Sequence, residues 1–343
     1  MRPSAAVANP HFPRHSTDGV ELSRDRDGLL FLSSLPAVTP PRLAAIVSSF
    51  ATYRDFATAS PGMRAAKLGP WVTDLPRLPA TPEPVVLPRG VSVLLPDDDA
   101  YPANLRRQPT LAPILFTTGY LPATTRSRTP EVVAVTGTRF PSRTGLAVAA
   151  TAGRSIARYS MVTAAVMAVG VGGSAIASAV SNLGTAIAVL PSGHSCYPAP
   201  QILSDLVAFS GCAISPFYPS TPPSDAAYQH ATALAVHLAS AVVCADVGSP
   251  LSSHRSCAPE AAQSAGVPII APRPEDSTWP SHSDLGLLSL TSRRHREPRA
   301  PFATRVVSTP DSLDDAVREV SVRLRHFPAP SRAPQRVSAP HVS

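Results

Sequence analysis

Apolar and polar residues alternate along the middle of the chain in a pattern that predicts strands separated by helices. The expected strands are Val132–Thr136, Met161–Val166, Thr185–Leu190, Cys212–Ile214, Ala241–Ala245 and Val267–Ile270. Segments with helical spacing lie between them, near residues 145–159, 173–182, 199–209, 228–239 and 257–265. Apolar strands alternating with helices indicate a sheet covered on both faces, so we predict an α/β fold with a Rossmann-like, doubly wound and mostly parallel sheet.

The pattern before this region is different and predicts a small helical N-terminal module. Leu43, Ile46, Val47 and Phe50 recur at helical spacing, after prolines that suit the first turn of a helix. Two short strands are expected in a Pro-rich connector, one within GVSVLLP from Gly90 and one at Ile114–Thr117. Near the C-terminus, Ser312-Leu313-Asp314-Asp315 fits the start of a helix.

These changes of pattern divide the chain into seven segments. We expect a disordered N-terminus at 1–25, a helical module at 26–68, a connector with short strands at 69–130, a Rossmann-like domain at 131–272, a flexible linker at 273–302, a strand and helix at 303–326, and a disordered tail at 327–343.

Composition adds bounds on the compartment. The N-terminus has no apolar core typical of a signal peptide, and glycines and serines interrupt the longest apolar stretch, Met161–Val180. The four cysteines form no CxxC pair, which favours small core residues in a reducing compartment over disulfides or a zinc site. We therefore expect a cytoplasmic protein that does not contact a membrane.

The formal charge of +7 suggests nucleic-acid binding, but its distribution weakens that interpretation. Residues 131–272 hold five basic and five acidic side chains, so the excess charge lies outside the predicted sheet domain. Four of those five basic residues fall between Arg139 and Arg158, which allows one local patch. Non-specific binding to nucleic acid needs several such cations on one face.

The loop after the first predicted sheet strand is the main candidate site. Gly137 lets the backbone approach an anion, and the amides that begin the next helix can donate to it. Arg139 and Arg143 carry charges suited to a phosphate. The candidate phosphate-binding residues, all expected at one edge of the sheet, are Gly137, Thr138, Arg139, Arg143, Gly170, Ser192 and Gly193. The alternative is that the glycines only form tight turns and Arg139 is solvated.

Other candidate chemistry is weaker. His230 and His237 share a helical face without a nearby Cys or Asp ligand, so we expect surface or packing residues and no metal site. Ser192-Gly193-His194 lacks the G-x-S-x-G nucleophile motif. The acidic run at 97–99 is expected to be a solvated turn, and SRRHRE at 292–297 a solvated linker. We expect no catalytic residue and no cofactor.

Six strings in this chain occur in the order and at the spacing of the DNA-processing protein A family (DprA, also called Smf), which the chain therefore resembles. The strings are LLFLSSLPAVTPPRLAAIVSSF at 29–50, GVSVLLPDDDAYPANLR at 90–106, VAVTGTRFPSRTG at 133–145, the segment beginning GTAIAVLPSG at 184–224, LASAVVCADVGSPLSSH at 238–254 and GVPIIAPRP at 266–274. The resemblance implies a Rossmann-like domain, single-stranded DNA binding, a homodimer, transfer of the strand to a RecA-type recombinase, and no enzymatic activity.

The departures from the family pattern fall on polar positions that face the ligand. The Ser, Arg and Asp of the family's S-G-x-A-R-G-I-D are replaced by Ala165, Val169 and Gly172. The family's F-P-R-R-N-R lies over 228–233, where this chain has no arginine, and the Glu of V-V-E-A is Asp246. Each missing arginine–phosphate contact lowers DNA affinity by on the order of 1–2 kcal/mol.

Three functions follow from these observations. The first is a DprA-like protein that binds single-stranded DNA weakly and supports DNA uptake, transformation and recombinase loading. The second is a Rossmann-like scaffold or protein-interaction module whose ligand site has decayed. The third is a nucleotide-binding sensor, because folds of this type often take nucleotides at the same edge of the sheet. New arginine contacts from Arg106, Arg107, Arg154 or Arg158 would favour the first.

Overall fold

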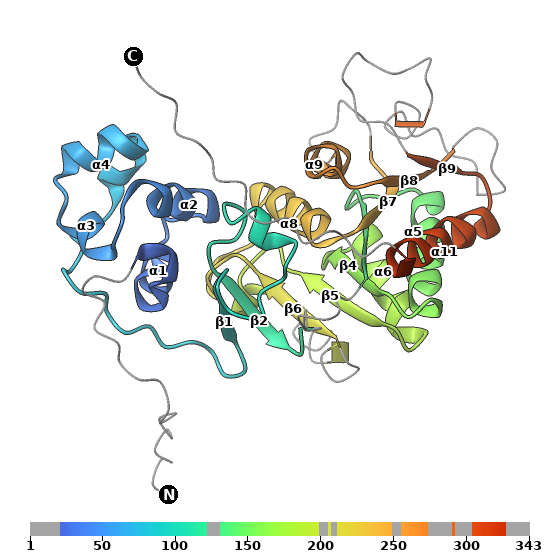
Figure 1. Ribbon diagram of the computed structural model, residues 1–343, viewed down its shortest axis with the longest axis horizontal. Coiled ribbons are helices and arrows are strands. Elements are labelled where there is room, and N and C mark those ends of the chain that lie inside the picture. The colour runs from blue at the N-terminus through green and yellow to red at the C-terminus, as the bar shows by residue number, and fades with distance from the viewer. Residues whose placement is uncertain are drawn as a thin grey trace, which may run out of the picture.

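The computed structural model describes residues 21–121, 131–198, 205–206, 211–248, 255–273, 290–291 and 304–326 (Figure 1). Residues 1–20 of the expected disordered N-terminus, the expected tail at 327–343 and most of the expected linker at 273–302, with its SRRHRE run, lie outside these residues. No helix among the described residues is both long enough and apolar enough to cross a membrane.

A nine-stranded sheet forms the centre of the molecule. Its strands are β1 (Ser92–Leu94), β2 (Leu115–Gly119), β3 (Val132–Gly137), β4 (Val162–Val166), β5 (Thr185–Val189), β6 (Cys212–Ser215), β7 (Ala241–Asp246), β8 (Ile269–Pro272) and β9 (Arg305–Val307). They lie in the order β1-β2-β6-β5-β4-β3-β7-β8-β9. Strands β1 and β2, and β2 and β6, pair antiparallel, whereas every other neighbouring pair is parallel.

The strand order confirms the predicted doubly wound fold. The chain passes outward from β3 through β4, β5 and β6, then returns to place β7 on the other side of β3. The carboxyl ends of β3 and β7 therefore flank the point where the winding reverses, which is the usual ligand position in open α/β sheets. The two strands end side by side, with Gly137 opposite Asp246.

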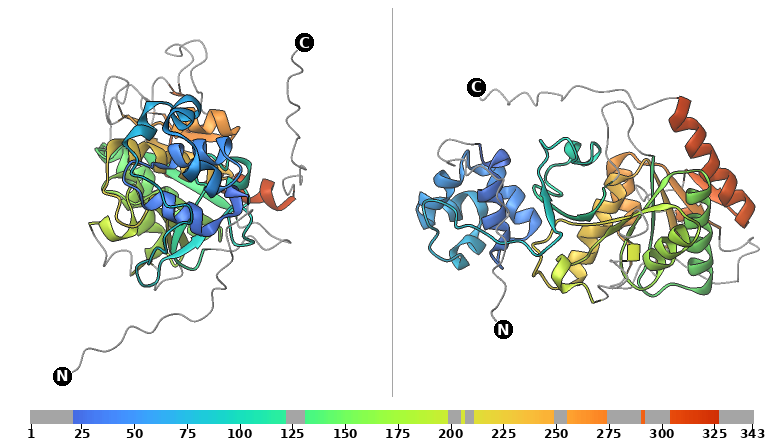
Figure 2. Two further views of the ribbon diagram at one scale, coloured as in Figure 1. Left: turned by 90° about the vertical axis from the view of Figure 1, so that its left-hand side faces the viewer. Right: turned by 90° about the horizontal axis from the view of Figure 1, so that it is seen from below.

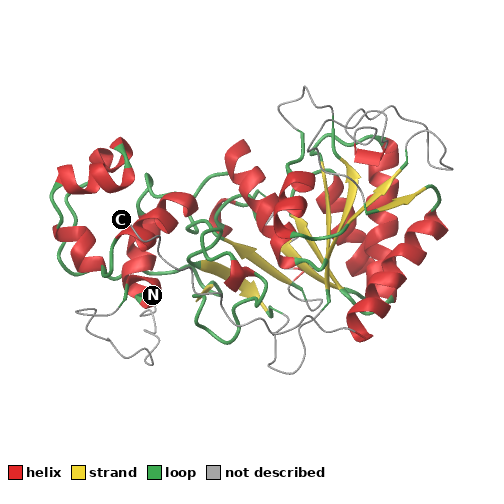
Figure 3. Ribbon diagram, turned by 45° about the horizontal axis from the view of Figure 1, so that its top comes forward, coloured by secondary structure: helices red, strands yellow, loops and turns green. Residues whose placement is uncertain are grey.

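Helices cover both faces of the sheet (Figure 3). The helices of this part are α5 (Arg143–Arg158), α6 (Val171–Ser181), α8 (Asp225–Leu238), α9 (Ala258–Ala265) and α11 (Pro310–His326), with the 3-10 turns η3 (Leu105–Arg107) and η4 (His194–Cys196). Because these helices bury both faces of the strands, β3 and β7 are apolar at nearly every position.

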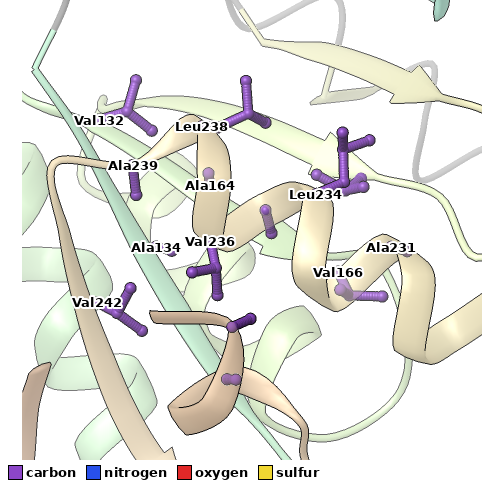
Figure 4. Close-up of a cluster of buried hydrophobic side chains, with 14 of the residues drawn as sticks. Val132, Ala134, Ala164, Val166, Ala231, Leu234, Val236, Leu238, Ala239 and Val242 are labelled. Carbon is purple, nitrogen blue, oxygen red and sulfur yellow. The ribbon is translucent and has the colours of Figure 1, made fainter. Parts of the chain in front are cut away.

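Alternate residues of β3 belong to two separate cores. Val132 and Ala134 pack with Leu234 of α8 in one buried cluster (Figure 4). Val133 and Val135 face the other way and pack in a second cluster with residues of α5, α6 and α11. This alternation follows from the two-residue period of a strand, and it fixes which loops meet at the carboxyl edge of the sheet.

The helical module lies at the β1 end of the sheet, opposite α11 (Figures 1 and 2). Its elements are η1 (Leu22–Arg24), α1 (Arg26–Ser34), α2 (Pro40–Ser49), α3 (Tyr53–Thr58), α4 (Pro61–Leu68) and η2 (Pro70–Asp74). Leu22 is fully buried in its core, so residues 21–25 belong to the module although the sequence assigned them to the disordered N-terminus. The same core includes Ile114 and Phe116 beside the sheet.

Another difference from the sequence prediction concerns the segment before β3. Strands β1 and β2 were expected in a separate connector, yet β2 pairs with β6 and extends the main sheet. The acidic run at 97–99 is a turn in which Asp97 and Asp99 are exposed, and it also pairs with the helical module, Asp97 with Arg24 and Asp98 with Arg26. These contacts join segments that are distant in the chain.

Candidate functional site

The loop between β3 and α5 brings several predicted site residues to the carboxyl edge of the sheet. Ser142 caps α5, because its Oγ accepts a hydrogen bond from the Gly145 amide at 3.0 Å. Arg143 is the first residue of the helix and its side chain is exposed. This is the geometry in which amides of a helix N-terminus can hold an anion.

An internal carboxylate already lies at this helix start. Oδ2 of Asp246, the last residue of β7, accepts hydrogen bonds from the Ser142 amide at 2.8 Å and from Ser142 Oγ at 2.9 Å. Its Oδ1 accepts from the Gly248 amide at 3.1 Å. A Cβ on Gly145 would lie only 2.6 Å from the same carboxylate. Asp246 is 3% exposed, so it is a buried anion that the loop holds without any external ligand.

Gly137 and Thr138 shape this loop through contacts with the same strand end. A Cβ on Gly137 would lie 2.5 Å from the Asp246 carbonyl oxygen and 2.5 Å from a Val171 methyl group. The Thr138 amide donates to the Asp246 carbonyl at 2.8 Å, and Thr138 Oγ1 accepts from the Phe140 amide at 3.1 Å. Close packing therefore requires a glycine at position 137, and two hydrogen bonds fix Thr138 in the loop.

Arg139 points from this loop toward α8. Its guanidinium pairs with the Asp225 carboxylate and lies over the Tyr228 ring, 5.0 Å from the centroid. Tyr228 donates its hydroxyl to the Gly137 carbonyl at 2.9 Å, and burial raises the pKa of Tyr228 to about 12. The ring is therefore neutral at physiological pH and attracts the cation through its π face. The Arg139 side chain is 29% exposed, so it is neither fully solvated nor free of a partner.

Gly170 lies against the backbone of the same loop. It precedes α6 with φ of +106°, and a Cβ there would lie 2.8 Å from the Arg139 carbonyl oxygen and 2.9 Å from that of Thr138. Only glycine combines this backbone conformation with so close an approach. The structure thus brings Gly170 together with Arg139, although its contacts are those of a tight turn.

Ser192 and Gly193 follow β5 and contact the loop after β6. The Gly193 amide donates to the Thr221 carbonyl at 2.8 Å, and a Cβ on Gly193 would overlap the Tyr218 and Pro219 carbonyl oxygens. Ser192 is fully buried, and its Oγ donates to the Gly193 carbonyl at 3.1 Å. Gly193 thus packs against the loop after β6, and the Ser192 hydroxyl donates inside the protein.

Beside Arg139 lies a cavity of about 740 Å³ that the sequence did not predict. It lies at the carboxyl ends of β4 and β5, between α6 and the start of α8. Arg139 and Ser192 are the predicted site residues that line it. The signal that could have revealed it is the replacement of polar family residues by apolar ones after β4, where Met167 and Val169 stand at the ligand edge.

The other arginines do not gather around the loop. Arg158 pairs with Asp314 at 3.4 Å, and Arg255 pairs with Glu260. Arg154 donates to Thr151 at 3.5 Å, within its own helix. Arg106 donates to two carbonyl oxygens of the acidic turn at 97–99. These four arginines therefore contact groups of the protein itself. Arg107, on η3, is exposed.

The histidines and cysteines described next contact backbone carbonyl groups or are buried in the protein. His230 Nε2 lies 2.7 Å from the Leu111 carbonyl oxygen, and His237 Nδ1 lies 2.8 Å from that of Ala233. Burial lowers the pKa of His194 to about 4 and raises the pKa of the Cys212 and Cys244 thiols to about 12. Within the described ranges, no three His, Cys, Asp or Glu residues lie close enough together to hold a metal ion.

Comparisons with known proteins give one family match and two similar folds. Residues 92–256 match the family described as DNA recombination-mediator protein A. The fold is similar to that of DNA processing protein A from Streptococcus pneumoniae, with a TM-score of 0.54 and 16% identity over 83% of this chain and 94% of that one. It is also similar to DNA processing protein A from Helicobacter pylori, with a TM-score of 0.51 and 18% identity over 67% of this chain and 96% of that one. No curated protein sequence matches the chain.

Proposed function

Because residues 92–256 match the DNA recombination-mediator protein A family, we propose that this chain binds single-stranded DNA. The Helicobacter pylori protein of similar fold is described by its single-stranded DNA binding mode. In this proposal the chain acts in the cytoplasm as a homodimer, supports DNA uptake, and passes the strand to a RecA-type recombinase. It binds and transfers the strand without catalysing a reaction.

The observation that carries the proposal is the chemistry of the β3–α5 loop. Three adjacent features suit a flexible strand: the Arg139 guanidinium, the exposed Arg143 side chain, and the Phe140 ring, which is 71% exposed. Cations bind the phosphates of a single strand, while an exposed aromatic ring stacks on a base whatever its identity. A bound DNA strand would contact this loop at the carboxyl edge of the sheet, where the winding reverses.

The same geometry supports weak affinity. Asp225 competes with phosphate for Arg139, and Asp246 uses the Ser142 donors at the start of α5. With Arg139 and Arg143 as the two proposed phosphate contacts, the logarithm of the binding constant should fall with the logarithm of salt concentration with a slope of about −1.4. A slope this shallow separates a two-cation site from a broad basic surface.

The test is fluorescence anisotropy of a labelled single-stranded oligonucleotide of about 30 nucleotides, titrated at low and at physiological salt. The Arg139→Ala and Arg143→Ala variants should each weaken binding by about tenfold at low salt. Asp225→Asn removes the competing carboxylate and should strengthen binding. Arg318→Ala on α11, where Arg318 pairs with Asp315, is the matched control and should bind as the unmodified chain does.

Two results would overturn this function. If the unmodified chain does not bind at low salt, the protein does not bind single-stranded DNA on its own, and the scaffold function takes its place. If binding is strong but unaffected by Arg139→Ala, Arg143→Ala and Asp225→Asn, the DNA strand binds elsewhere on the molecule. A log–log slope much steeper than the two-contact value would also contradict the proposed site.

A further inference from the structure

The cavity beside Arg139 has the character of a small-molecule site. Its volume of about 740 Å³ lies within the range of pockets that enclose small organic ligands. Most of its lining comes from apolar side chains, which suit an uncharged ring system or branched hydrocarbon far better than a sugar-phosphate chain. We propose that this cavity binds a compact apolar molecule that bears one acidic group, at a site that shares Arg139 with the proposed strand site.

The apolar body of such a ligand has defined surfaces to contact. Ile176, Ala177 and Val180 project from one side of α6, and Met167 lies at the end of β4. Tyr197 supplies an aromatic surface on the β5 side. Filling the cavity would remove this surface from water, and the gain is proportional to the apolar area covered.

The acidic group has one place to bind. Arg139 is the single basic residue among the described residues that line the cavity. Its partner Asp225 is 65% exposed, and an ion pair this exposed contributes little to stability. A carboxylate or sulfonate on the ligand can therefore replace Asp225 on the guanidinium while the Asp225 side chain turns toward water. The Tyr228 ring keeps Arg139 in position during this exchange.

The charges around the cavity limit the ligand to a single acid. Asp205 and Asp225 both line it, so the described lining carries two negative charges and one positive charge. A nucleoside diphosphate or triphosphate needs several cations or a helix N-terminus to balance its charge. A monoanion requires only the Arg139 guanidinium, which is why we assign this ligand class and not a polyphosphate.

Two fluorescent probes test separately whether the cavity recognises the apolar body and the acidic group of the proposed ligand. 1-Anilinonaphthalene-8-sulfonate has an apolar body and one sulfonate, whereas N-phenyl-1-naphthylamine has the same ring system without the acid. Both should bind the full chain saturably, as measured by fluorescence titration. Ala177→Phe fills the cavity from an exposed position of α6 and should weaken both probes by about tenfold or more.

The Arg139 and Asp225 variants test recognition of the acid without altering the apolar walls. Arg139→Gln should weaken the sulfonate probe by about tenfold and leave the neutral probe unchanged. Asp225→Asn should tighten the sulfonate probe alone. Met63→Ala, which removes an exposed apolar side chain from α4, is the control for non-specific surface binding and should alter neither titration.

Either of two outcomes would overturn the inference. If Ala177→Phe, shown to be folded by circular dichroism, binds both probes as the unmodified chain does, the cavity is not the site. If Arg139→Gln and Asp225→Asn change both probes alike, the cavity does not recognise an acid. Neither outcome depends on DNA, because the oligonucleotide titration with Arg143→Ala tests the strand site separately.

Discussion

At the scale of single residues, Asp246 decides what the β3–α5 loop can hold. Its buried carboxylate accepts three hydrogen bonds from Ser142 and Gly248. A phosphate at the same place would meet a fixed negative charge a few ångströms away and would have to replace these bonds. The loop is therefore built around the chain's own anion, and an external phosphate has to bind on its outer side, through Arg139 or Arg143.

Replacing Asp246 with alanine should destabilise the fold by about 3 kcal/mol, because the Ser142 and Gly248 amides lose a charged acceptor in a buried place. Urea unfolding measures this loss. Inorganic phosphate should then restore part of the stability of Asp246→Ala by binding the vacated donors. The control Asp225→Ala, on an exposed carboxylate, should change stability by less than about 0.5 kcal/mol. Equal stabilisation of the unmodified chain by phosphate would contradict an internally filled loop.

The sequence identified this loop but not the residue that fills it. A glycine directly after an apolar strand is a local signal, and the strand expected at Val132–Thr136 and the helix expected near 145–159 lie on either side of this loop in the structure. Asp246 lies 104 residues from Ser142 and meets it only because β7 pairs with β3. The Arg139–Asp225 pair, 86 residues apart, depends on the same tertiary arrangement. Local spacing carries no information about either contact.

At the scale of elements, the strands buried on both faces were predictable because each is an unbroken apolar run. The expected strand Val132–Thr136 differs from β3 by one residue, and Ala241–Ala245 differs from β7 by one. The attachment of β2 to β6 was not predictable, because antiparallel pairing between segments about 100 residues apart depends on the whole chain path. The cavity was missed for a similar reason, since its walls come from α6, the start of α8 and the loops after β3, β4 and β5.

Basic residues of the helical module donate to carbonyl groups of the module itself, although their charge could suggest a DNA-binding surface. Lys67 donates to the carbonyl of Ser49 at the end of α2, at 2.9 Å, and lies over the Phe50 ring. Arg64 donates to the Ala57 and Ala59 carbonyls at the end of α3. Cations placed at helix C-termini stabilise the unpaired carbonyls and the helix dipole. These charges therefore support the module's fold.

The start of α1 should give the stability of the module a distinct pH dependence. Asp25 is 2% exposed, and burial raises its pKa above the ordinary 3.8, although the hydrogen bond from the Gly28 amide opposes the shift. A raised folded-state pKa means that the folded chain binds this proton more tightly than the unfolded chain does. The contribution of Asp25 to stability is therefore greatest below pH 3.8 and is lost as pH rises through the folded-state pKa.

Asp25→Asn retains the capping acceptor without the charge, so its stability relative to the unmodified chain should increase as pH rises above 3.8 and through the folded-state pKa of Asp25. Urea unfolding at several pH values measures the difference. Asp74→Asn, an exposed carboxylate on η2, is the control for the loss of a charge that is not buried. A difference between Asp25→Asn and the unmodified chain that stays constant with pH would show that burial does not shift this carboxyl group.

At the scale of the whole molecule, the acidic turn at 97–99 joins the helical module to the sheet. Arg26 at the start of α1 donates from Nη2 to both carboxylate oxygens of Asp98, at 2.8 and 2.6 Å, and from Nη1 to the Val93 carbonyl of β1 at 2.6 Å. Together with the shared core around Phe116, these contacts make the module continuous with the sheet. The arrangement of the two parts thus depends on two nitrogens of the Arg26 guanidinium, one on the Asp98 carboxylate and one on the Val93 carbonyl, which together fix orientation as well as distance.

Replacing Asp98 with alanine should therefore loosen the module as well as lower overall stability. The Arg26–Asp98 ion pair and the hydrogen bond from the Leu95 amide to Asp98 are lost. Because both side chains of the ion pair are partly exposed, this loss should cost about 2 kcal/mol. Hydrogen exchange should then become faster in α1 and α2, while β3 to β5 stay protected. Asp97→Ala, whose carboxylate is 58% exposed, is the matched control and should leave exchange in α1 unchanged.

A double-mutant cycle distinguishes this docking role from a general loss of stability. Arg26→Ala and Asp98→Ala remove the two sides of one contact, so their combined effect on unfolding should fall short of the sum of the single effects by about 1 kcal/mol or more. Additive effects would mean that the pair does not hold the module against the sheet. The shared core around Phe116 would then carry the attachment alone, and exchange in α1 would remain slow in both single variants.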